Sequence, residues 1–333
     1  GRWIALTGSA PVETNPVSVI DKYTIEFKLR EPSLAFPHIL TMALPPIYDS
    51  TEAKKHITVE DPFARKWLKS HSCGFSPYYV DSQTDESVIL KARQDYERIN
   101  PSIKTIEYAK INSEDRVNAL LDGCIDLFKA PTPLEANKIK EAEDFMIFEA
   151  LGNQQLSLQM NINIKPYNDL HFRKALMHII PYDEIIQEIY LGYARPWNGV
   201  VSDVNPAYQE FFDGSTNFTI AKEELEMSDY NNELIELYYP QENVLQKQIV
   251  SAIIKNAATL NLSIQGCAIS SEKMSELQKQ FQIPFAIAGG GHRCAEMSYA
   301  MPHDFGDRIY GITNWIDYNN PDLNKMIESI KFN

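Results

Sequence analysis

The sequence has little of what marks nucleic-acid-binding or membrane-spanning proteins. Its 31 lysines and arginines stand against 45 acidic residues, a formal net charge of −14, so a basic surface for phosphate backbones is not expected. The longest apolar runs are short and interrupted, as at 283–288, and none approaches the roughly 20 apolar residues of a membrane helix. No signal-peptide pattern is visible at the start. These features leave a cytosolic protein or the mature part of an exported one.

Cysteine is scarce, with four residues in the chain: Cys73, Cys124, Cys267 and Cys294. No two of them have zinc-site or redox spacing. The favoured interpretation is four buried or half-buried thiols. Export would permit two disulfides, for which Cys73 with Cys124 and Cys267 with Cys294 is the simplest pairing.

Catalytic motifs are also missing. The chain has no Gly-x-Ser-x-Gly elbow, because Ser76 is followed by Pro77, which prevents the required strand-to-helix turn. The acidic pair at 223–224 is typical of a solvated helix face. A metal site built from His292 and His303 would need a third ligand. We therefore expect no enzyme, no cofactor and no metal.

A run of three glycines, Gly289 to Gly291, precedes His292 and follows a predicted strand. A glycine run after a strand can hold an anion when a helix begins there, but this one lacks the spacing of a nucleotide-binding loop. It predicts a flexible loop or a close backbone approach that could line a ligand cleft.

The first half of the chain predicts alternating strands and helices. Alternation of apolar and polar residues favours a half-buried hairpin at 17–30, turning at Asp21 and Lys22. Ser113 would cap a helix that Gly123 ends, before a short buried strand. The remaining elements are helices at 33–43 and 61–70, strands at 87–92 and 102–111, and the short strand at 125–128. This order indicates an α/β lobe.

The second half repeats this alternation after a strand at 154–162. A helix capped by Asp169 and a second one at 183–190 precede a loop at 193–219 that is rich in proline, glycine and asparagine. Beyond it we expect helices at 220–227, 243–260, 270–281 and 322–330, and strands at 234–239, 262–267 and 285–288. With 333 residues, the chain is long enough for two lobes. Aromatic residues in loops, such as Tyr78 and Trp197, would suit a cleft, although ordinary packing would also explain them.

Short motifs in a fixed order resemble those of the family 5 extracellular solute-binding proteins, the dipeptide, oligopeptide and nickel group. Asp-Lys-Tyr-Thr-Ile-Glu-Phe-Lys-Leu at 21–29 resembles the hairpin of that family, and Gly-Phe-Ser-Pro-Tyr at 74–78 takes the place of its Gly-Thr-Gly-Pro-Tyr/Phe segment. Further matches lie at 89–96, 116–126, 158–161, 169–176, 181–196 and 319–323. Each motif alone is weak, and their common order carries the resemblance.

The resemblance implies an α/β, two-lobed periplasmic-binding-protein-like fold of type II. It would place a first lobe at 1–153, with a remnant of an extra subdomain at 1–70, a hinge strand at 154–162 and a second α/β lobe at 163–333. Family members begin earlier and end later, so we expect either a truncated chain or an unusually reduced member of the family, with an incomplete first lobe.

The implied function is that of the solute-binding component of an ABC importer, which closes about a hinge on a peptide or other small solute between its lobes. The partners would be that ligand and a membrane permease, with no nucleic acid, and the chain would be a monomer. The location would be periplasmic or extracellular, anchored or soluble. The alternative is the ligand-sensing domain of a cytoplasmic transcription regulator with the same binding fold.

The predicted ligand-binding residues come from several segments: Phe75, Tyr78, Met160, Asn161, Trp197, Gly290, His292 and Arg293. Peptide binders of the family hold the ligand amine with an Asp in the region that aligns with 289–293, and no Asp occurs there. His292 or Arg293 could instead favour an anionic or metal-containing ligand.

Overall fold

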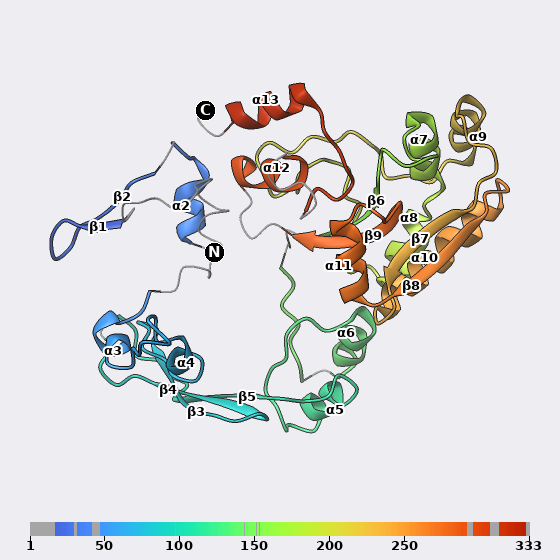
Figure 1. The fold of residues 1–333 in the computed structure, drawn as a ribbon. Coiled ribbons are helices and arrows are strands. Elements are labelled where there is room, and N and C mark those ends of the chain that lie inside the picture. The colour runs from blue at the N-terminus through green and yellow to red at the C-terminus, as the bar shows by residue number, and fades with distance from the viewer. Residues whose placement is uncertain are drawn as a thin grey trace. The chain divides into compact units, whose positions relative to one another are not determined.

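A computed structural model describes residues 17–29, 32–41, 47–96, 98–142, 144–150, 152, 154–291, 296–306 and 313–330. The chain divides into two compact units (Figure 1). One unit combines Gly1–Thr41 with Phe148–Asn333, and the other is Met42–Ile147. The sequence predicted a first lobe at 1–153 and a second lobe at 163–333. That division places 1–41 in the first lobe rather than with the later residues, and it stays a prediction.

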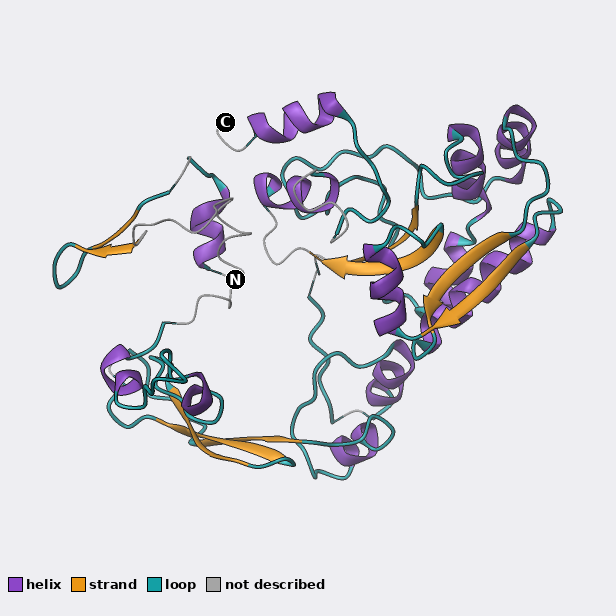
Figure 2. Ribbon diagram, viewed as in Figure 1, coloured by secondary structure: helices purple, strands orange, loops and turns teal. Residues whose placement is uncertain are grey.

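The discontinuous unit is built on a four-stranded mixed sheet with the order β6-β9-β7-β8 (Figure 2). Strands β7 (Ile235–Pro240) and β8 (Ile264–Ile269) are parallel, and α10 (Val244–Ala258) connects them. Strand β9 (Phe285–Gly291) follows α11 (Ser271–Lys279) and pairs in parallel with β7 through one residue pair. Strand β6 (Gln154–Met160) is an edge strand, antiparallel to β9 along its whole length. The strand–helix–strand alternation predicted for this half is confirmed.

The core of this unit lies between the sheet and its helices. Apolar residues every three or four positions give α10 a buried stripe through Ile249, Ile253 and Ala257. That stripe joins Phe172 and Leu176 of α7 (Leu170–Ile179) and inward residues of the sheet in one cluster. Further helices of this unit are α8 (Tyr182–Glu184), the π-helix η1 (Ile185–Ile189), α9 (Phe218–Met227), α12 (Met297–Phe305) and α13 (Pro321–Ser329).

The hairpin of β1 (Val17–Val19) and β2 (Ile25–Phe27) forms at the predicted turn, where the Asp21 carboxylate accepts hydrogen bonds from Tyr23 and Thr24. The expectation of a half-buried strand is wrong, because Tyr23 is 87% exposed and all of β2 is exposed. A two-stranded ribbon has no second layer of its own. Among the described residues, its aromatic contact is with α2 (Ala35–Leu40), between Phe27 and Phe36.

The continuous unit contains the antiparallel meander β3 (Tyr78–Gln83), β4 (Ser87–Ala92) and β5 (Thr105–Ala109). Its helices are α3 (Ser50–Lys54), α4 (Arg65–Leu68), α5 (Arg116–Leu121) and α6 (Pro133–Lys140). Val117 and Leu120 of α5 pack against Ile139 of α6 in a small separate core.

Two predictions for this unit are wrong. Residues 125–128 form no strand, because the backbone N–H groups of Cys124 and Ile125 both donate to the Ala119 carbonyl after Gly123 turns the chain at φ +71°. Ser113 does not cap α5, whose N-cap is Asp115 without a side-chain hydrogen bond. The α/β alternation expected here is replaced by a meander followed by two helices.

The glycine run is also not a loop. Gly289 to Gly291 continue β9 and pair with Leu156, Gln155 and Gln154 of β6. A Cβ on Gly289 would come within 3.2 Å of the Leu156 side chain, whereas Gly290 has no atom within 4 Å of the same position. The close backbone approach anticipated from the sequence therefore occurs inside a strand.

Candidate functional site

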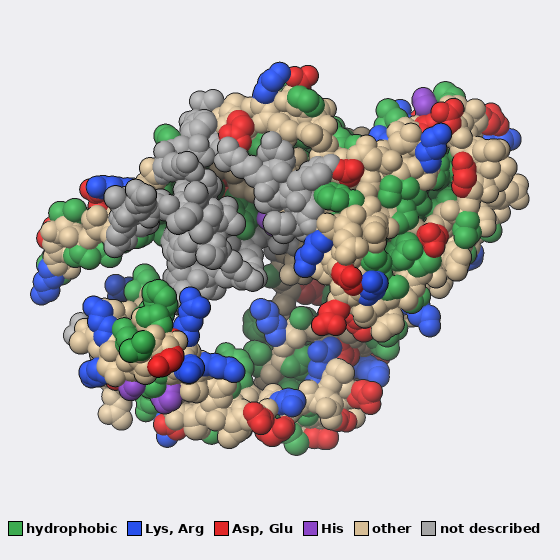
Figure 3. Space-filling view, viewed as in Figure 1, with side chains coloured by type: hydrophobic (Ala, Val, Ile, Leu, Met, Phe, Trp, Pro, Cys, Tyr) green, Lys and Arg blue, Asp and Glu red, His purple; other side chains and the backbone are tan. Residues whose placement is uncertain are grey.

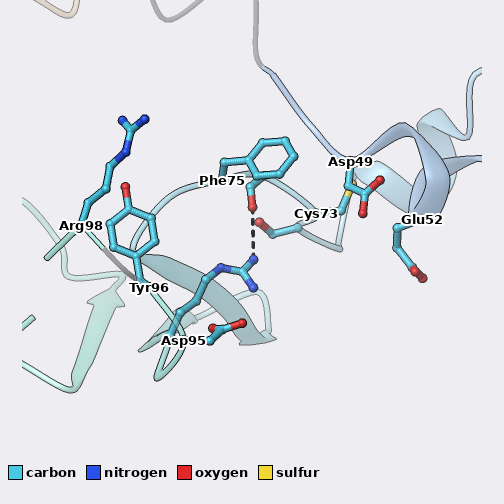
Figure 4. A pocket seen from close by; sticks show the side chains of 10 residues that line it. Asp49, Glu52, Cys73, Phe75, Asp95, Tyr96 and Arg98 are labelled. Carbon is cyan, nitrogen blue, oxygen red and sulfur yellow. Dashed lines mark hydrogen bonds between the residues drawn. The ribbon is translucent and has the colours of Figure 1, made fainter. Parts of the chain in front are cut away.

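The continuous unit holds an open cavity of about 700 Å³ (Figure 4). Its wall comes from the N-terminal end of α3, from the segment between α4 and β3, and from the residues after β4. The lining residues are Asp49, Glu52, Ser72, Cys73, Gly74, Phe75, Arg93, Asp95, Tyr96 and Arg98.

Arg93 fixes the floor of this cavity. Its Nε donates to the Ser76 carbonyl and its Nη2 to the Gly74 carbonyl, each at 3.2 Å. Its guanidinium also lies over the Tyr79 ring, 5.5 Å from the centroid. On the other side, the Asp49 N–H donates to the Cys73 carbonyl at 2.8 Å. The segment 73–76 is thus tied to both α3 and the end of β4.

The cavity wall carries charges of both signs. The N–H of Thr51 lowers the pKa of Asp49, and the hydrogen bond from Lys55 lowers the pKa of Glu52, so both carboxylates are ionised at neutral pH. Figure 4 shows Arg98 and Tyr96 on the opposite side from Asp49 and Glu52. Such a wall can hold polar groups of either sign. It offers no nucleophile paired with a base, since the Cys73 thiol is buried without a histidine among the lining residues.

Two predicted residues belong to this unit, and the structure separates their roles. Phe75 lines the cavity and is 64% exposed, which is unusual for a large aromatic side chain. Tyr78 begins β3 and does not line the cavity. Its hydroxyl donates to the Ile103 carbonyl at 2.9 Å, which ties β3 to the segment before β5.

Met160 and Asn161 lie at the end of β6, and the structure gives them internal contacts. Met160 packs against the main core. Asn161 is 1% exposed, its Nδ2 donates to the Phe281 carbonyl at 3.3 Å, and its Oδ1 accepts from the Asn163 N–H at 3.0 Å. A ligand contact through Asn161 would require these bonds to break, so the observed role of its side chain is structural.

Gly290 lies at the other end of the same ladder, paired with Gln155, while Met160 pairs with Phe285. Five residues of extended strand separate the two ends by roughly 17 Å, so a small solute would not reach both. Trp197, in the loop after η1, is half-buried, and its Nε1 is shielded without a hydrogen-bond partner among the described residues. His292 and Arg293 lie outside the described residues.

Most of the cavity wall could not be predicted from the sequence. Residues 89–96 matched a motif of the resembled family, but no spacing linked Arg93 or Tyr96 to Asp49 and Glu52, some forty residues earlier. Cys73, Cys124 and Cys267 are free thiols, and Cys73 is buried and Cys267 half-buried, as the favoured interpretation expected. The expectation is wrong for Cys124, which is exposed in the turn after α5, and Cys294 lies outside the described residues. In the part of the chain that the structure describes, no cluster of three potential metal ligands occurs, and no helix is long and apolar enough to cross a membrane.

Comparison with known proteins decides the family. The model of the bacterial extracellular solute-binding proteins, family 5 (middle), matches residues 6–310. The chain belongs to this family. Family 5 consists of solute-binding proteins rather than enzymes, and the resemblance that the sequence motifs carried is confirmed.

Curated relatives and solved structures resemble this chain in sequence and in fold. The chain is 25% identical over 185 residues to the glutathione-binding protein GsiB of Shigella flexneri, which covers 55% of this chain and 35% of that protein. The structure of the ABC transporter substrate-binding protein CtaP of Listeria monocytogenes has a TM-score of 0.78 at 17% identity, covering 95% of this chain and 64% of that one.

A third match is DppA of Helicobacter pylori, solved in complex with the peptide STSA. Its TM-score is 0.70 at 20% identity, covering 95% of this chain and 62% of that one. The predicted periplasmic-binding-protein-like α/β fold is therefore confirmed. The chain spans about a third of the length of the curated relative.

Proposed function

We propose that this chain is the solute-binding component of an ABC import system, acting outside the cytoplasmic membrane with a membrane permease as partner. Family membership supports this function over the regulator alternative. A monomer that closes on its solute and binds no nucleic acid remains part of the proposal. On the face that Figure 3 shows, acidic and basic side chains are interspersed over the described residues.

One structural observation supports a ligand with an extended backbone. Strand β9 pairs with β6 along 285–291, but its other edge pairs with β7 only at Ala286. Among the described residues, no strand pairs with that edge from Ile287 to Gly291. The last three of these residues carry no side chain, so another backbone can approach closely.

An unpaired strand edge offers backbone donors and acceptors at regular spacing, which is how sheet edges bind extended peptides. Gly290 is exposed, and the space around its Cβ position is open. We therefore assign the ligand backbone to the Gly289–Gly291 edge, with side-chain preferences set elsewhere. DppA of H. pylori binds a peptide, which is consistent with this assignment.

A calorimetric titration with tetrapeptides tests the proposal. A Gly290→Val variant should keep the fold, because the position is open, and should weaken peptide binding by at least about tenfold through loss of close backbone approach. Val244→Ala, at a 68% exposed residue of α10, is the control and should bind as the wild type does. Tetrapeptides with N-methylated backbones should also bind less tightly. Equal affinity of Gly290→Val and wild type would refute the assignment to this edge.

A further inference from the structure

An indole ring in the continuous unit stacks on two imidazole rings. The Trp67 ring stacks on His56 with centroids 4.1 Å apart and planes 6° from parallel. The same indole also stacks on His71, at 4.8 Å and 9°. No motif in the sequence pointed to this His56–Trp67–His71 stack, and the proposed transport function does not use it.

Local structure explains the position of each ring. Trp67 is in α4, and His71 follows one turn later, where its N–H donates to the Trp67 carbonyl at 3.1 Å. Its ring Nδ1 lies 3.0 Å from the same oxygen and 3.1 Å from the Ser70 hydroxyl. Because a carbonyl only accepts, Nδ1 carries the proton in neutral His71, and Nε2 is the atom that gains a second one.

His56 follows α3, and its Nε2 is shielded from solvent without a hydrogen-bond partner. The nearest carboxylate is Glu52, with Oε1 at 3.5 Å, and the other oxygen of Glu52 binds the Lys55 ammonium at 2.5 Å. Glu52 and Lys55 are the charged groups that the described contacts place beside His56. The groups that contact the His71 ring nitrogen are neutral. They are the Trp67 carbonyl and the Ser70 hydroxyl.

Protonation changes what holds this stack together. A neutral imidazole packs on the indole by dispersion, whereas an imidazolium adds cation–π attraction to the ring face. Protonated His56 would also give its shielded Nε2 a charge partner in Glu52. Histidine is the side chain that ordinarily gains its proton between about pH 8 and 5, and a gained proton would add this attraction to the stack.

The stack is connected to the cavity at two points. Glu52 contacts His56 and also lines the cavity. His71 directly precedes Ser72, Cys73, Gly74 and Phe75, which form the cavity wall. We propose that the His56–Trp67–His71 stack is a proton-responsive clamp that tightens the 72–75 wall of the cavity as pH falls.

Hydrogen exchange of the Asp49 amide tests the clamp directly, because this N–H donates to the Cys73 carbonyl across the wall. Protection factors, which correct for the intrinsic pH dependence of exchange, are compared at pH 7.5 and 5.5. Wild-type protection should rise about two- to fivefold at the lower pH, the range expected for an exposed cation–π pair. His56→Gln and Trp67→Leu should show no rise, and His171→Gln, in the other unit, should behave as the wild type does.

Emission from Trp67 gives a second readout that does not depend on the wall. The difference spectrum between wild type and Trp67→Phe isolates this indole from the other three tryptophans. Contact with an imidazolium should quench it on acidification, and His56→Gln with His71→Gln should abolish the quenching. The proposal would be overturned if neither the Asp49 protection factor nor the Trp67 emission changed with pH. No solute enters either measurement, so this outcome is independent of the transport function.

Discussion

The Arg116 guanidinium of α5 forms a two-point ion pair with the Glu135 carboxylate of α6. Nε donates to Oε1 at 2.6 Å and Nη2 to Oε2 at 2.5 Å, and Glu135 also accepts from the Thr132 N–H and hydroxyl at the helix N-terminus. The Arg116 side chain lies over the Phe128 ring as well. This pair joins the two helices of the small core.

Removal of this pair should make stability depend less on pH. Hydrogen bonds from Arg116 above all, and then from Thr132, lower the pKa of Glu135 to about 2, from about 4.5 in the unfolded chain. The stability that the Glu135 carboxylate contributes is therefore present above pH 4.5 and is lost as pH falls toward 2. Glu135→Gln should cost about 1–2 kcal/mol in urea unfolding at pH 7, and this difference should shrink at pH 3. Glu276→Gln, at an exposed pair with Lys273, is the control and should change stability little. A Glu135→Gln deficit that is the same at both pH values would contradict the role of the pair.

Asn161 should behave as a structural residue. Asn161→Ala removes two side-chain hydrogen bonds at a position that is 1% exposed, to the Phe281 carbonyl and from the Asn163 N–H, which should cost about 2–3 kcal/mol in unfolding free energy. Asn163→Ala, which removes an exposed contact to Asp317, is the matched control and should cost less. Wild-type stability together with lost solute binding in Asn161→Ala would restore the ligand role predicted from the sequence.

The glycines of the sheet should differ in their tolerance of a side chain. A Cβ on Gly266 of β8 would lie 2.9 Å from the Val250 side chain of α10, so Gly266→Ala should destabilise the chain by about 1–3 kcal/mol. Gly290→Ala meets open space and should be neutral or slightly stabilising by thermal unfolding, since alanine loses less backbone entropy. A large loss of stability in Gly290→Ala would argue against the strand at 289–291.

Asp169 should stabilise two segments at once. Its Oδ1 accepts from the His171 and Phe172 N–H groups at the start of α7, and its Oδ2 accepts from the Asp229 N–H after α9. The Asp229 contact is the largest cause of its lowered pKa. Asp169→Ala should cost at least about 1 kcal/mol, and Asp169→Asn, which retains an N-cap oxygen, should recover part of that loss. Equal losses in the two variants would show that the cap is not the source of stability.

Features with a local cause could be predicted from the sequence. The strand at 87–92 was predicted with its observed bounds, and the Asp169 cap fixed the start of α7. The resemblance of the ordered motifs gave the family and fold. The first half of the chain was predicted less well, because an exposed hairpin has the same alternation as a half-buried strand.

Features set by distant contacts could not be predicted. Pro302 lies inside α12, where proline ordinarily argues against a helix, and the glycines of β9 are held by pairing with β6. The cavity wall and the stack around Trp67 depend on residues brought together by the fold, with no common spacing in sequence. Of the predicted ligand residues, Phe75 lines the cavity and Gly290 lies at the unpaired strand edge, and both stay predictions as contacts.

Solute binding by the purified chain tests the central claim most directly. Native mass spectrometry with an equimolar mixture of di-, tri- and tetrapeptides, glutathione and nickel–histidine should show one solute retained at a 1:1 ratio. Retention should fall in Gly290→Val and persist in Val244→Ala. A chain that is folded by circular dichroism and retains no solute from this mixture would contradict the account.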